Sequence, residues 1–341
     1  MFWFLDRDLT LNTSCDWQIL IGLNGNDRLS SKHNNTTLIG NGGNDTLTTD
    51  MIRGFNYTRD VRGAQFGGSG NDKLFFQSAT ASKYVGVVQD GGSGDDLIES
   101  YTYLLGNGTL QCEKSLMETC VSGDSGNDVI KIEATLQKAD GHISNKAFGG
   151  SGNDSIYLSA DTLDSVAGST GKNYAEGGTG NDTMVARGYG STQDSLVNVL
   201  YGESGHDTLT AYIFNKMGAS LLYGGEGDDT LSTFGGKGNK LFGGSGNDKL
   251  IGGEGDDILI GGTGNDTMST GEGLDLVVFG CNSGQDVLTQ FCIYRDKIVF
   301  EDGQSFKSLS VGAEGTTLFF NDGSSVLVMG EFTTDLTAYF G

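Results

Sequence analysis

A nine-residue pattern recurs thirteen times along this chain of 341 residues. Residues 261–269, GGTGNDTMS, show its form: Gly-Gly-x-Gly-x-Asp, any residue, an aliphatic residue and any residue. Glycine suits a backbone that must turn tightly, aspartate supplies a hard anionic oxygen, and the aliphatic residue can point from a short strand into a core. The pattern therefore predicts an all-β fold, a parallel β-roll or β-solenoid in which successive coils stack.

The spacing of the sixth-position aspartates predicts how the coils are built. These residues are Asp27, Asp45, Asp72, Asp96, Asp128, Asp154, Asp182, Asp207, Asp229, Asp248, Asp257, Asp266 and Asp275. From Asp248 to Asp275 they recur every nine residues, as expected when each repeat makes half a coil. Upstream of Asp248 the intervals run from 18 to 32 residues, which is one whole coil or more, so those aspartates should share one side.

Two rows of aspartates follow from this spacing. The long row takes one residue per coil: Asp27, Asp45, Asp72, Asp96, Asp128, Asp154, Asp182, Asp207, Asp229, Asp248 and Asp266. The opposite side holds only Asp257 and Asp275. Residues 235–240, GGKGNK, look like a third member that is one residue short and has lost its aspartate ligand. The alternative is an ordinary loop around Lys240, and both interpretations predict no ion there. We predict about eleven coils, one long row and one short row.

The aliphatic residues after each aspartate should form a ladder inside the coils. They are Leu29, Leu47, Leu74, Ile98, Ile130, Ile156, Met184, Leu209, Leu231, Leu250, Leu259, Met268 and Val277. The residues beyond 18 per coil should form loops or short hairpins on the side away from the long row, either as a binding face or as tolerated insertions. They occupy 50–62, 77–84, 101–118, 134–145, 160–172, 187–198 and 212–219.

Four segments follow from these patterns. Residues 1–21 would be an N-terminal cap, with Trp3, Trp17, Ile19 and Leu20 as cover for the first strand edges. Residues 22–223 would form the single-row solenoid with its loop insertions, and residues 224–278 the strict nonapeptide β-roll. Residues 279–341 would form a C-terminal β cap, with a strand at 297–300 and a hairpin of 318–320 and 326–328 around Asn321-Asp322-Gly323.

The composition limits which classes of partner the chain can bind. The chain has 57 Gly, no Pro and a formal net charge of −23, so nucleic acid and anionic membranes are poor partners and divalent cations are natural ones. No run reaches the length of a membrane span, and Met1–Leu11 lacks the pattern of a secretory signal. We expect a monomer. The five cysteines show no Cys-x-x-Cys pair; Cys112 and Cys120 could close a loop, or all could be buried free thiols.

Calcium suits the repeat chemistry. The ion takes six to eight hard oxygens, which the sixth-position carboxylates and glycine carbonyls of two stacked turns can supply together. The thirteen aspartates are therefore the predicted ligands, and each ion should lie between coils, about ten ions in all. The fifth-position side chains should point outward and tolerate a left-handed backbone. They are Asn26, Asn44, Asn71, Asn127, Asn153, Asn181, Asn247, Asn265, Asp95, Asp228 and Asp256, with His206 in place of Asn in one repeat.

We find no pattern that predicts catalysis. The chain has no His-Glu-x-x-His, no Gly-x-Ser-x-Gly and no phosphate-binding loop, and it has only three histidines. Pairs such as Asp95-Asp96 lie inside the repeat, which explains them better than acid–base chemistry does. We therefore expect a protein that is not an enzyme and that takes only calcium as a cofactor.

The repeats over residues 22–278 resemble those of the RTX (repeats-in-toxin, hemolysin-type) calcium-binding proteins. Residues 284–291, followed by 296–300, are similar to the C-terminal flanking region of secreted members of that family. The resemblance implies an extracellular module that is exported by a type I system, with a possible signal in 279–341, and that folds on meeting calcium.

Two alternative functions stay open. One is a calcium-dependent adhesin or an ice- or polysaccharide-binding solenoid, with cell-surface glycan or ice as partner. Outward ranks beside the fifth-position residues, Ser69, Ser93, Ser125, Ser151 and Thr179, resemble those of ice-binding solenoids. The other is the C-terminal part of a larger RTX toxin or hydrolase.

Overall fold

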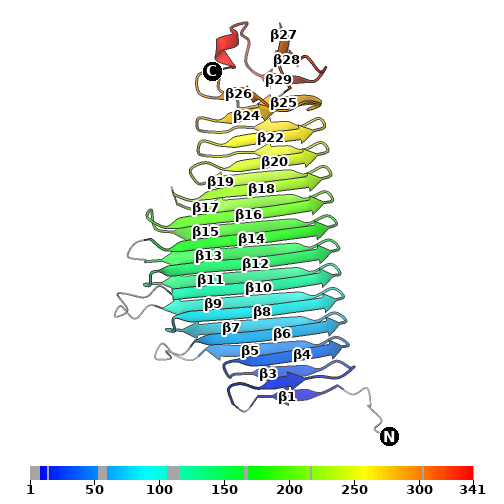
Figure 1. Cartoon of the computed structure of the whole chain (residues 1–341), viewed down its shortest axis with the longest axis vertical. Coiled ribbons are helices and arrows are strands. Elements are labelled where there is room, and N and C mark those ends of the chain that lie inside the picture. Colours follow the sequence, from blue (N-terminus) through cyan, green and yellow to red (C-terminus); the bar gives the residue numbers. More distant parts are fainter. Residues whose placement is uncertain are drawn as a thin grey trace.

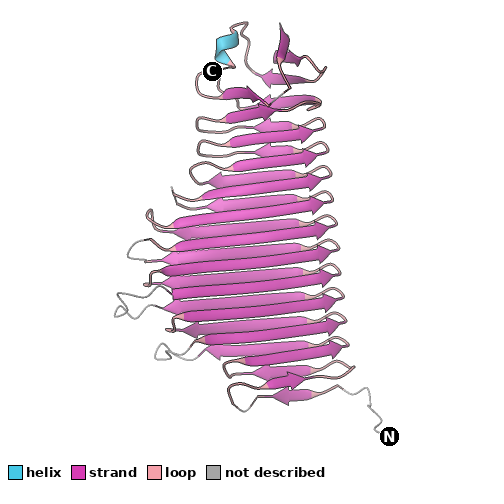
Figure 2. Cartoon of the chain, in the orientation of Figure 1, coloured by secondary structure: helices cyan, strands magenta, loops and turns pink. Residues whose placement is uncertain are grey.

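The chain is wound into a parallel β-solenoid of two long sheets that lie face to face (Figure 1). The computed structural model describes residues 8–13, 15–52, 60–105, 115–164, 168–215, 217–301 and 303–340. Strands alternate between the sheets along the sequence, so each coil gives one strand to each sheet. Nearly all of the described chain between the turns is strand (Figure 2).

One sheet holds the odd-numbered strands. They are β1 (Thr10–Asn12), β3 (Arg28–Ser31), β5 (Thr46–Ile52), β7 (Lys73–Thr80), β9 (Leu97–Leu105), β11 (Val129–Gln137), β13 (Ser155–Leu163), β15 (Thr183–Gly190), β17 (Thr208–Ile213), β19 (Thr230–Gly235), β21 (Lys249–Ile251), β23 (Thr267–Ser269) and β25 (Gln285–Thr289). Past β25 it continues with β29 (Ser325–Met329), β28 (Gly315–Phe320) and β27 (Phe306–Val311).

The other sheet holds the even-numbered strands. They are β2 (Ile19–Ile21), β4 (Thr36–Gly42), β6 (Val61–Ser69), β8 (Tyr84–Ser93), β10 (Ser115–Ser125), β12 (Gly141–Ser151), β14 (Thr170–Thr179), β16 (Ser195–Ser204), β18 (Ala219–Glu226), β20 (Lys240–Ser245), β22 (Ile258–Thr263), β24 (Leu276–Phe279) and β26 (Lys297–Phe300). A short 3₁₀ helix, η1 (Leu336–Ala338), lies near the C-terminus.

The described solenoid is longer than the sequence predicted. The described chain makes thirteen coils, each with one strand in each sheet, which is two coils more than the predicted eleven. The first extra coil comes from the predicted N-terminal cap: β1 pairs with β3 and β2 with β4, so Ile19 and Leu20 lie in a coil and do not cover one. Trp3 lies outside the described residues. The last coil, β25 with β26, comes from the predicted C-terminal cap.

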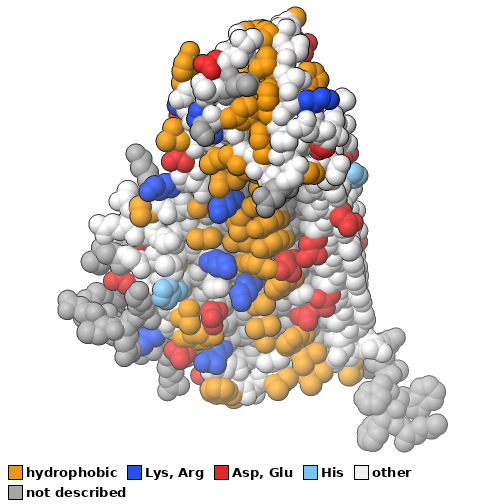
Figure 3. Space-filling view, turned by 45° about the horizontal axis from the view of Figure 1, so that its top comes forward, with side chains coloured by type: hydrophobic (Ala, Val, Ile, Leu, Met, Phe, Trp, Pro, Cys, Tyr) orange, Lys and Arg blue, Asp and Glu red, His pale blue; other side chains and the backbone are white. Residues whose placement is uncertain are grey.

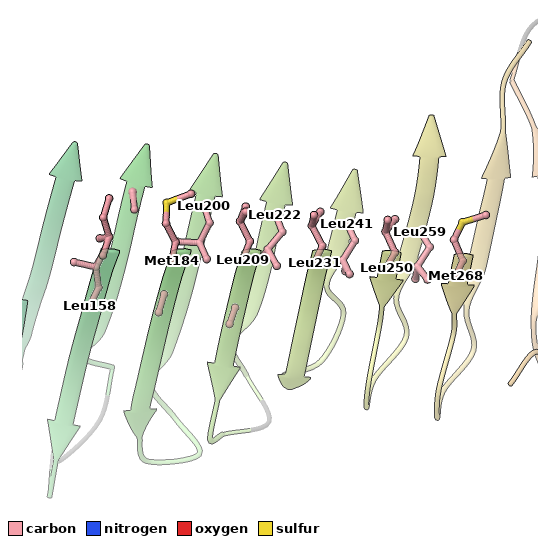
Figure 4. Packing of buried hydrophobic residues seen from close by; sticks show 14 of the residues in the cluster. Leu158, Met184, Leu200, Leu209, Leu222, Leu231, Leu241, Leu250, Leu259 and Met268 are labelled. Atoms are coloured by element: carbon pink, nitrogen blue, oxygen red, sulfur yellow. The ribbon is translucent and has the colours of Figure 1, made fainter. Parts of the chain in front are cut away.

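The predicted aliphatic ladder is confirmed. All thirteen of its residues are at most 2 % exposed, and along the odd-numbered sheet they pair with one another from coil to coil, as in Leu209 with Leu231 and Leu231 with Leu250. Leu200, Leu222 and Leu241 of the other sheet face them across the core (Figure 4). This stacking removes each side chain from water against copies of itself, which is the main force that holds the coils together.

The predicted loop insertions are mostly strand, which corrects the sequence analysis. The extra residues lengthen both strands of a coil, so that β10 and β12 reach eleven residues each while β21 and β23 have three. Only short connections remain on that side, apart from segments outside the described residues. Burial alternates along the insertions as in a strand, but inward positions such as Ser78, Thr80 and Thr102 are polar, so the apolar–polar pattern of a strand was absent from the sequence.

The wider coils contain a second hydrophobic core. It is built from Met51, Val61, Phe76, Val85, Val87, Leu104, Met117, Ala134, Leu136, Ile143 and Ala160. Phe76 is fully buried, and Gly63 of the facing sheet has no side chain because a methyl group there would collide with its ring. The middle of the solenoid thus carries two cores side by side.

Buried amide side chains accompany the change in width. Gln89 Nε2 donates to Gln65 Oε1 at 2.8 Å, and farther along Asn145 donates to Asn173 and Asn173 to Asn198, both at 2.9 Å. Their remaining N–H groups donate to strand carbonyls, such as Ser159 O for Asn145. Polar groups in a core are tolerated only when paired in this way, and here the pairing repeats from coil to coil.

The C-terminal cap has the predicted strand and hairpin. β26 occupies 297–300, and β28 and β29 pair antiparallel around Asn321-Asp322-Gly323. Tyr339, fully buried, accepts a hydrogen bond through its carbonyl from Ile298 N–H at 2.8 Å and so covers part of the last strand. This end of the stack is therefore closed by chain that runs in a different direction.

The cysteines differ from the prediction of buried thiols. Cys15, Cys120 and Cys281 are free and exposed, and Cys292 is free and partly exposed. Cys112 lies outside the described residues. Among the described residues, no helix has the length and apolar character needed to cross a membrane.

Candidate functional site

The aspartate turns line one edge of the solenoid, where each even-numbered strand passes to the next odd-numbered strand. In Figure 1 these short, regular turns form the right-hand edge, while the connections on the left vary. Glycines at the second and fourth positions have positive φ, for example +110° at Gly68 and +121° at Gly70. A side chain on Gly68 would also collide with the carbonyl oxygen of Asn41 in the neighbouring coil, so this packing requires glycine.

The long row of aspartates is continuous. The backbone N–H of each aspartate donates to Oδ1 of the aspartate in the next coil, at 2.7–2.9 Å, from Asp27 through Asp266. All of these carboxyls are at most 2 % exposed. The eleven residues assigned to this row from spacing alone thus lie in one line.

The row extends one coil beyond the repeats. Asp266 N–H donates to Oδ1 of Asp286 at 2.9 Å, and Asp286 is buried. Its turn, Ser283-Gly284-Gln285-Asp286, lacks the paired glycines by which the repeats were recognised. The signal was present nevertheless, because Asp286 lies 20 residues after Asp266 and an aliphatic residue follows two positions later.

The opposite edge carries the short row. Asp257 N–H donates to Asp275 Oδ1 at 2.9 Å, and Asp275 N–H to Asp296 Oδ1 at 3.3 Å. Asp296 was missed by the sequence analysis because its turn also lacks the glycines. Its Oδ2 accepts hydrogen bonds from Cys292 N–H and Thr270 Oγ1, so the row ends in a carboxylate whose oxygens are paired.

Asn239 takes the place of an aspartate at the start of the short row. Its N–H and Nδ2 both donate to Asp257 Oδ1, at 2.7 and 2.9 Å, and its own Oδ1 accepts Ser220 N–H. Lys240 is the first residue of β20, so the alternative of an ordinary loop around it is wrong. The missing aspartate is therefore replaced by a neutral amide, which supplies the backbone contacts of the turn without its charge.

One carboxylate oxygen in nearly every turn is buried without a partner. Oδ2 has no hydrogen-bond partner in the following residues: Asp45, Asp72, Asp96, Asp128, Asp154, Asp182, Asp207, Asp229, Asp248, Asp257, Asp266, Asp275 and Asp286. In Asp27, at the start of the long row, Oδ2 accepts the N–H of Leu23 at 2.7 Å. A buried, unpaired carboxylate oxygen is costly, so its repetition points to a cation.

A glycine of the same turn faces the unpaired oxygen in every one of these turns except those of Asp275 and Asp286. A methyl group on Gly40 would collide with both Asp45 Oδ2 and the carbonyl oxygen of Gly67 in the next coil, and Gly149 has the same relation to Asp154 and Gly177. Two hard oxygens from successive coils therefore face one small space. No three acidic, histidine or cysteine side chains cluster among the described residues, so backbone carbonyls would have to complete any ligand set. Carboxylate and carbonyl oxygens together are the donors that calcium prefers, and the site fits that ion.

The pKa values of the buried carboxyl groups lie well above the ordinary value for aspartate. Removal from water raises the pKa of Asp45 and Asp96 to about 7 and that of Asp257 to about 8, and the N–H of the preceding coil opposes this only in part. Neighbouring carboxylates in the row raise these pKa values further. Each row is thus a file of acidic groups with little counter-charge from the protein's own side chains: Arg295 lies near Asp275, and His206 near Asp207 and Asp229.

The fifth-position side chains have a different role from the one predicted. They are exposed, but their backbone is not left-handed; instead each side chain accepts the fifth-position N–H of the next coil, at 2.6–3.1 Å. His206 continues this ladder by accepting Asp228 N–H through Nδ1 at 2.8 Å. The ladder runs from Asp8 to Gln285. Aspartate bonds and fifth-position bonds point in opposite directions along the stack and fix each turn to both neighbours.

These features define a calcium-binding parallel β-roll. The model of the RTX calcium-binding nonapeptide repeat matches residues 34–50, 144–162, 160–188, 196–213, 218–239, 234–268 and 242–277. Between residues 34 and 277 the chain thus carries RTX calcium-binding repeats. No curated protein matches it.

Proposed function

We propose that this chain is an extracellular, non-enzymatic calcium-binding module that folds when it meets calcium after export by a type I system. The file of buried carboxylates with unpaired Oδ2 atoms carries the proposal. In the cytosol, where free calcium is low, these charges would repel one another and keep the chain unfolded. Outside the cell, calcium would bind the folded state alone and stabilise it by mass action.

The proposed ligands are the thirteen predicted aspartates with Asp286 added, together with carbonyl oxygens of the turn glycines. One ion between each pair of successive coils gives about ten ions, or about +20 against a net charge of −23. The ions would supply the missing counter-charge in each row. The division at 223/224 into single-row and strict segments and the secretion signal in 279–341 are part of this proposal.

The carboxylate pairs support a role without catalysis. Asp95 Oδ1 accepts the N–H and Nδ2 of Asn127, while Asp96 lies in the long row. Asp228 and Asp229 are engaged in the same two ladders. Acid–base catalysis needs a carboxyl group that reaches a substrate, and these groups are committed to the stack.

Ice binding is a weaker alternative. The serine rank is in register, Ser69 with Ser93, then Ser125, Ser151 and Thr179. The adjacent rank, however, uses its side-chain oxygens to accept backbone N–H groups, as Asn127 does for Asn153. Only the serine and threonine rank thus remains as a regular array of acceptors on this surface, which is a single row where ice binding would use two. A thermal-hysteresis assay on the calcium-loaded protein tests this alternative, and activity would restore it.

Circular dichroism and small-angle scattering with calcium and with a chelator test the main proposal. We expect an expanded coil in chelator and a rod-shaped β protein in calcium, reversibly. A β-rich rod that persists in chelator at neutral pH would contradict calcium-dependent folding. For the export signal, deletion of residues 279–341 should abolish secretion through a co-expressed type I system, whereas secretion of the truncated chain would move the signal elsewhere.

A further inference from the structure

A groove of about 640 Å³ crosses the outer face of the even-numbered sheet near its N-terminal end. Its floor follows one rank of paired residues through six successive strands: Ile19, Thr37, Ala64, Val88, Cys120 and Lys146. Five intervals of about 4.8 Å make this floor about 24 Å long. The groove is therefore elongated along the stack and suits an extended chain.

The floor is apolar and exposed. Ile19 is 64 % and Val88 46 % exposed, on a protein that otherwise carries a large excess of acidic groups. The face in Figure 3 shows a band of hydrophobic side chains along the solenoid, with basic side chains on one flank and acidic ones on the other. Backbone groups of the floor are paired within the sheet, so a ligand must be recognised by side chains and not by addition of a strand.

Trp17 closes the N-terminal end of the groove and is held at a cost. It is 78 % exposed and has φ = +66°, a left-handed conformation that bulky residues rarely adopt. Its N–H donates to Asn34 O, which fixes the backbone there. Trp17 thus combines a strained backbone with high exposure, and such strain clusters at ligand sites.

The basic groups of the groove are pre-positioned. The guanidinium of Arg62 lies 4.8 Å from the ring centroid of Tyr84, and Tyr84 Oη donates to Glu118. Gly86 permits this arrangement, since a methyl group there would collide with Tyr84 Oη. With Lys146, the groove holds two cations against one carboxylate that is already hydrogen-bonded.

The other aromatic row of this sheet offers no such platform. Tyr201, Tyr223 and Phe242 stack face to face, with ring centroids 4.8 and 4.6 Å apart. Their faces are thus covered by one another and only edges reach solvent. This row contributes to the stability of the stack, whereas Trp17 has a face available to a ligand.

We propose that the groove binds an extended polysaccharide that carries carboxylates. Trp17 would stack on the apolar face of one sugar, Arg62 and Lys146 would pair with carboxylates, and Asn35, Glu118 and Ser144 would meet hydroxyl groups. The proposal rests on calcium loading, because about ten ions would offset most of the net charge of −23 that otherwise repels polyanions. It goes beyond the proposed function, which names no such ligand.

Calorimetry on the full chain in excess calcium tests the proposal with two acidic probes, hyaluronan hexasaccharide and hexagalacturonate, and the neutral cellohexaose. We expect saturable binding of at least one acidic probe and at least about tenfold weaker binding of cellohexaose. Trp17→Asn, which suits a left-handed backbone, and Arg62→Ala should each weaken binding at least about tenfold. Tyr294→Ala, at a tyrosine that is 90 % exposed in the C-terminal region, is the matched control and should change nothing.

The cysteines give a second readout. Bound acidic probe should slow maleimide labelling of Cys120, in the groove, and leave that of Cys281 unchanged. Binding of neither acidic probe, equal binding of cellohexaose, or binding that survives both substitutions and leaves Cys120 unprotected would overturn the proposal. Circular dichroism of the same samples separates this failure from failure to fold on calcium.

Discussion

The wide middle coils and the narrow coils near Asp257 hold their stacks together by different means. Between Asp96 and Asp128 a coil takes 32 residues and gains a second hydrophobic core beside a single aspartate row. The buried amide side chains lie in the wide coils before and after it. Between Asp248 and Asp266 a coil takes 18 residues and has one core with aspartates on both edges. In the wide coils, burial of apolar side chains thus takes the place of bound cations in stabilising the stack. The narrow coils should therefore depend more on calcium for their stability.

Calcium withdrawal should separate the two regions most strongly. As a chelator lowers free calcium, amide exchange in residues 240–279 should rise on the order of a hundredfold before residues 97–151 lose protection, because the narrow coils have less apolar area to hold them. Hydrogen–deuterium exchange with mass spectrometry follows both regions in one sample. Simultaneous loss in both regions would show that the solenoid unfolds as a single unit and that width is irrelevant.

Acid should partly replace calcium. Folding raises the pKa of Asp45 to about 7 and of Asp257 to about 8 from 3.8, so the folded chain takes up protons. The calcium-free fold should therefore be most stable below about pH 4 and lose that stability as pH rises through 6 to 8. Circular dichroism in chelator should show β structure at pH 4 that disappears by pH 8. More β structure at pH 8 than at pH 4 would contradict this prediction, because protonation of the carboxyl groups would then destabilise the calcium-free fold.

Phe76→Ala tests the second core. Removing this buried ring should lower the free energy of unfolding by about 3–5 kcal/mol in saturating calcium, without changing the number of ions bound. Denaturant unfolding measures it, with Phe332→Ala, at a residue 58 % exposed, as the control. A loss below about 1 kcal/mol would mean that the second core adds little to the wide coils.

Asn173→Ala probes the amide side chains that lie between the cores. The substitution removes one hydrogen bond from Asn145 Nδ2 and leaves Asn198 Oδ1 without its donor, and the expected loss of stability is about 1–3 kcal/mol. Thr192→Ala, in an exposed connection of the same region, should stay within about 0.5 kcal/mol. If both variants unfold at the same denaturant concentration, the amide bonds do not stabilise the stack.

Glu203→Gly should have the smallest effect on stability, and it should raise stability where the preceding variants lower it. Glu203 occupies a second-position site with φ = +76°, where most repeats have glycine. Relief of this strain should stabilise the protein by about 1 kcal/mol. A thermal melt in calcium measures it. A lower melting temperature than wild type would show that the Glu203 side chain makes a contact worth more than the strain.

Much of the fold was predictable because one chemical requirement repeats. The aspartate register and the aliphatic ladder followed from spacing, since every coil needs a ligand, a turn and a core residue at fixed separation. The widened coils were not predictable from motifs, because residues such as Phe76 and Leu136 lie beyond the nine-residue pattern, in the parts of β7 and β11 that no motif marks. Asp286 and Asp296 were missed because recognition relied on glycines, which these turns lack although their aspartates occupy the same places.

Calcium stoichiometry tests the central claim most directly. Equilibrium dialysis of chelator-stripped protein at pH 7.5, with bound calcium measured by atomic emission, should give about ten ions per chain. Double substitution of Asp257 and Asp275 to Asn should remove only the one or two ions of the short row. Binding of about one to three ions to the unaltered chain would contradict the account, because the long row from Asp27 to Asp286 would then hold its coils together without metal.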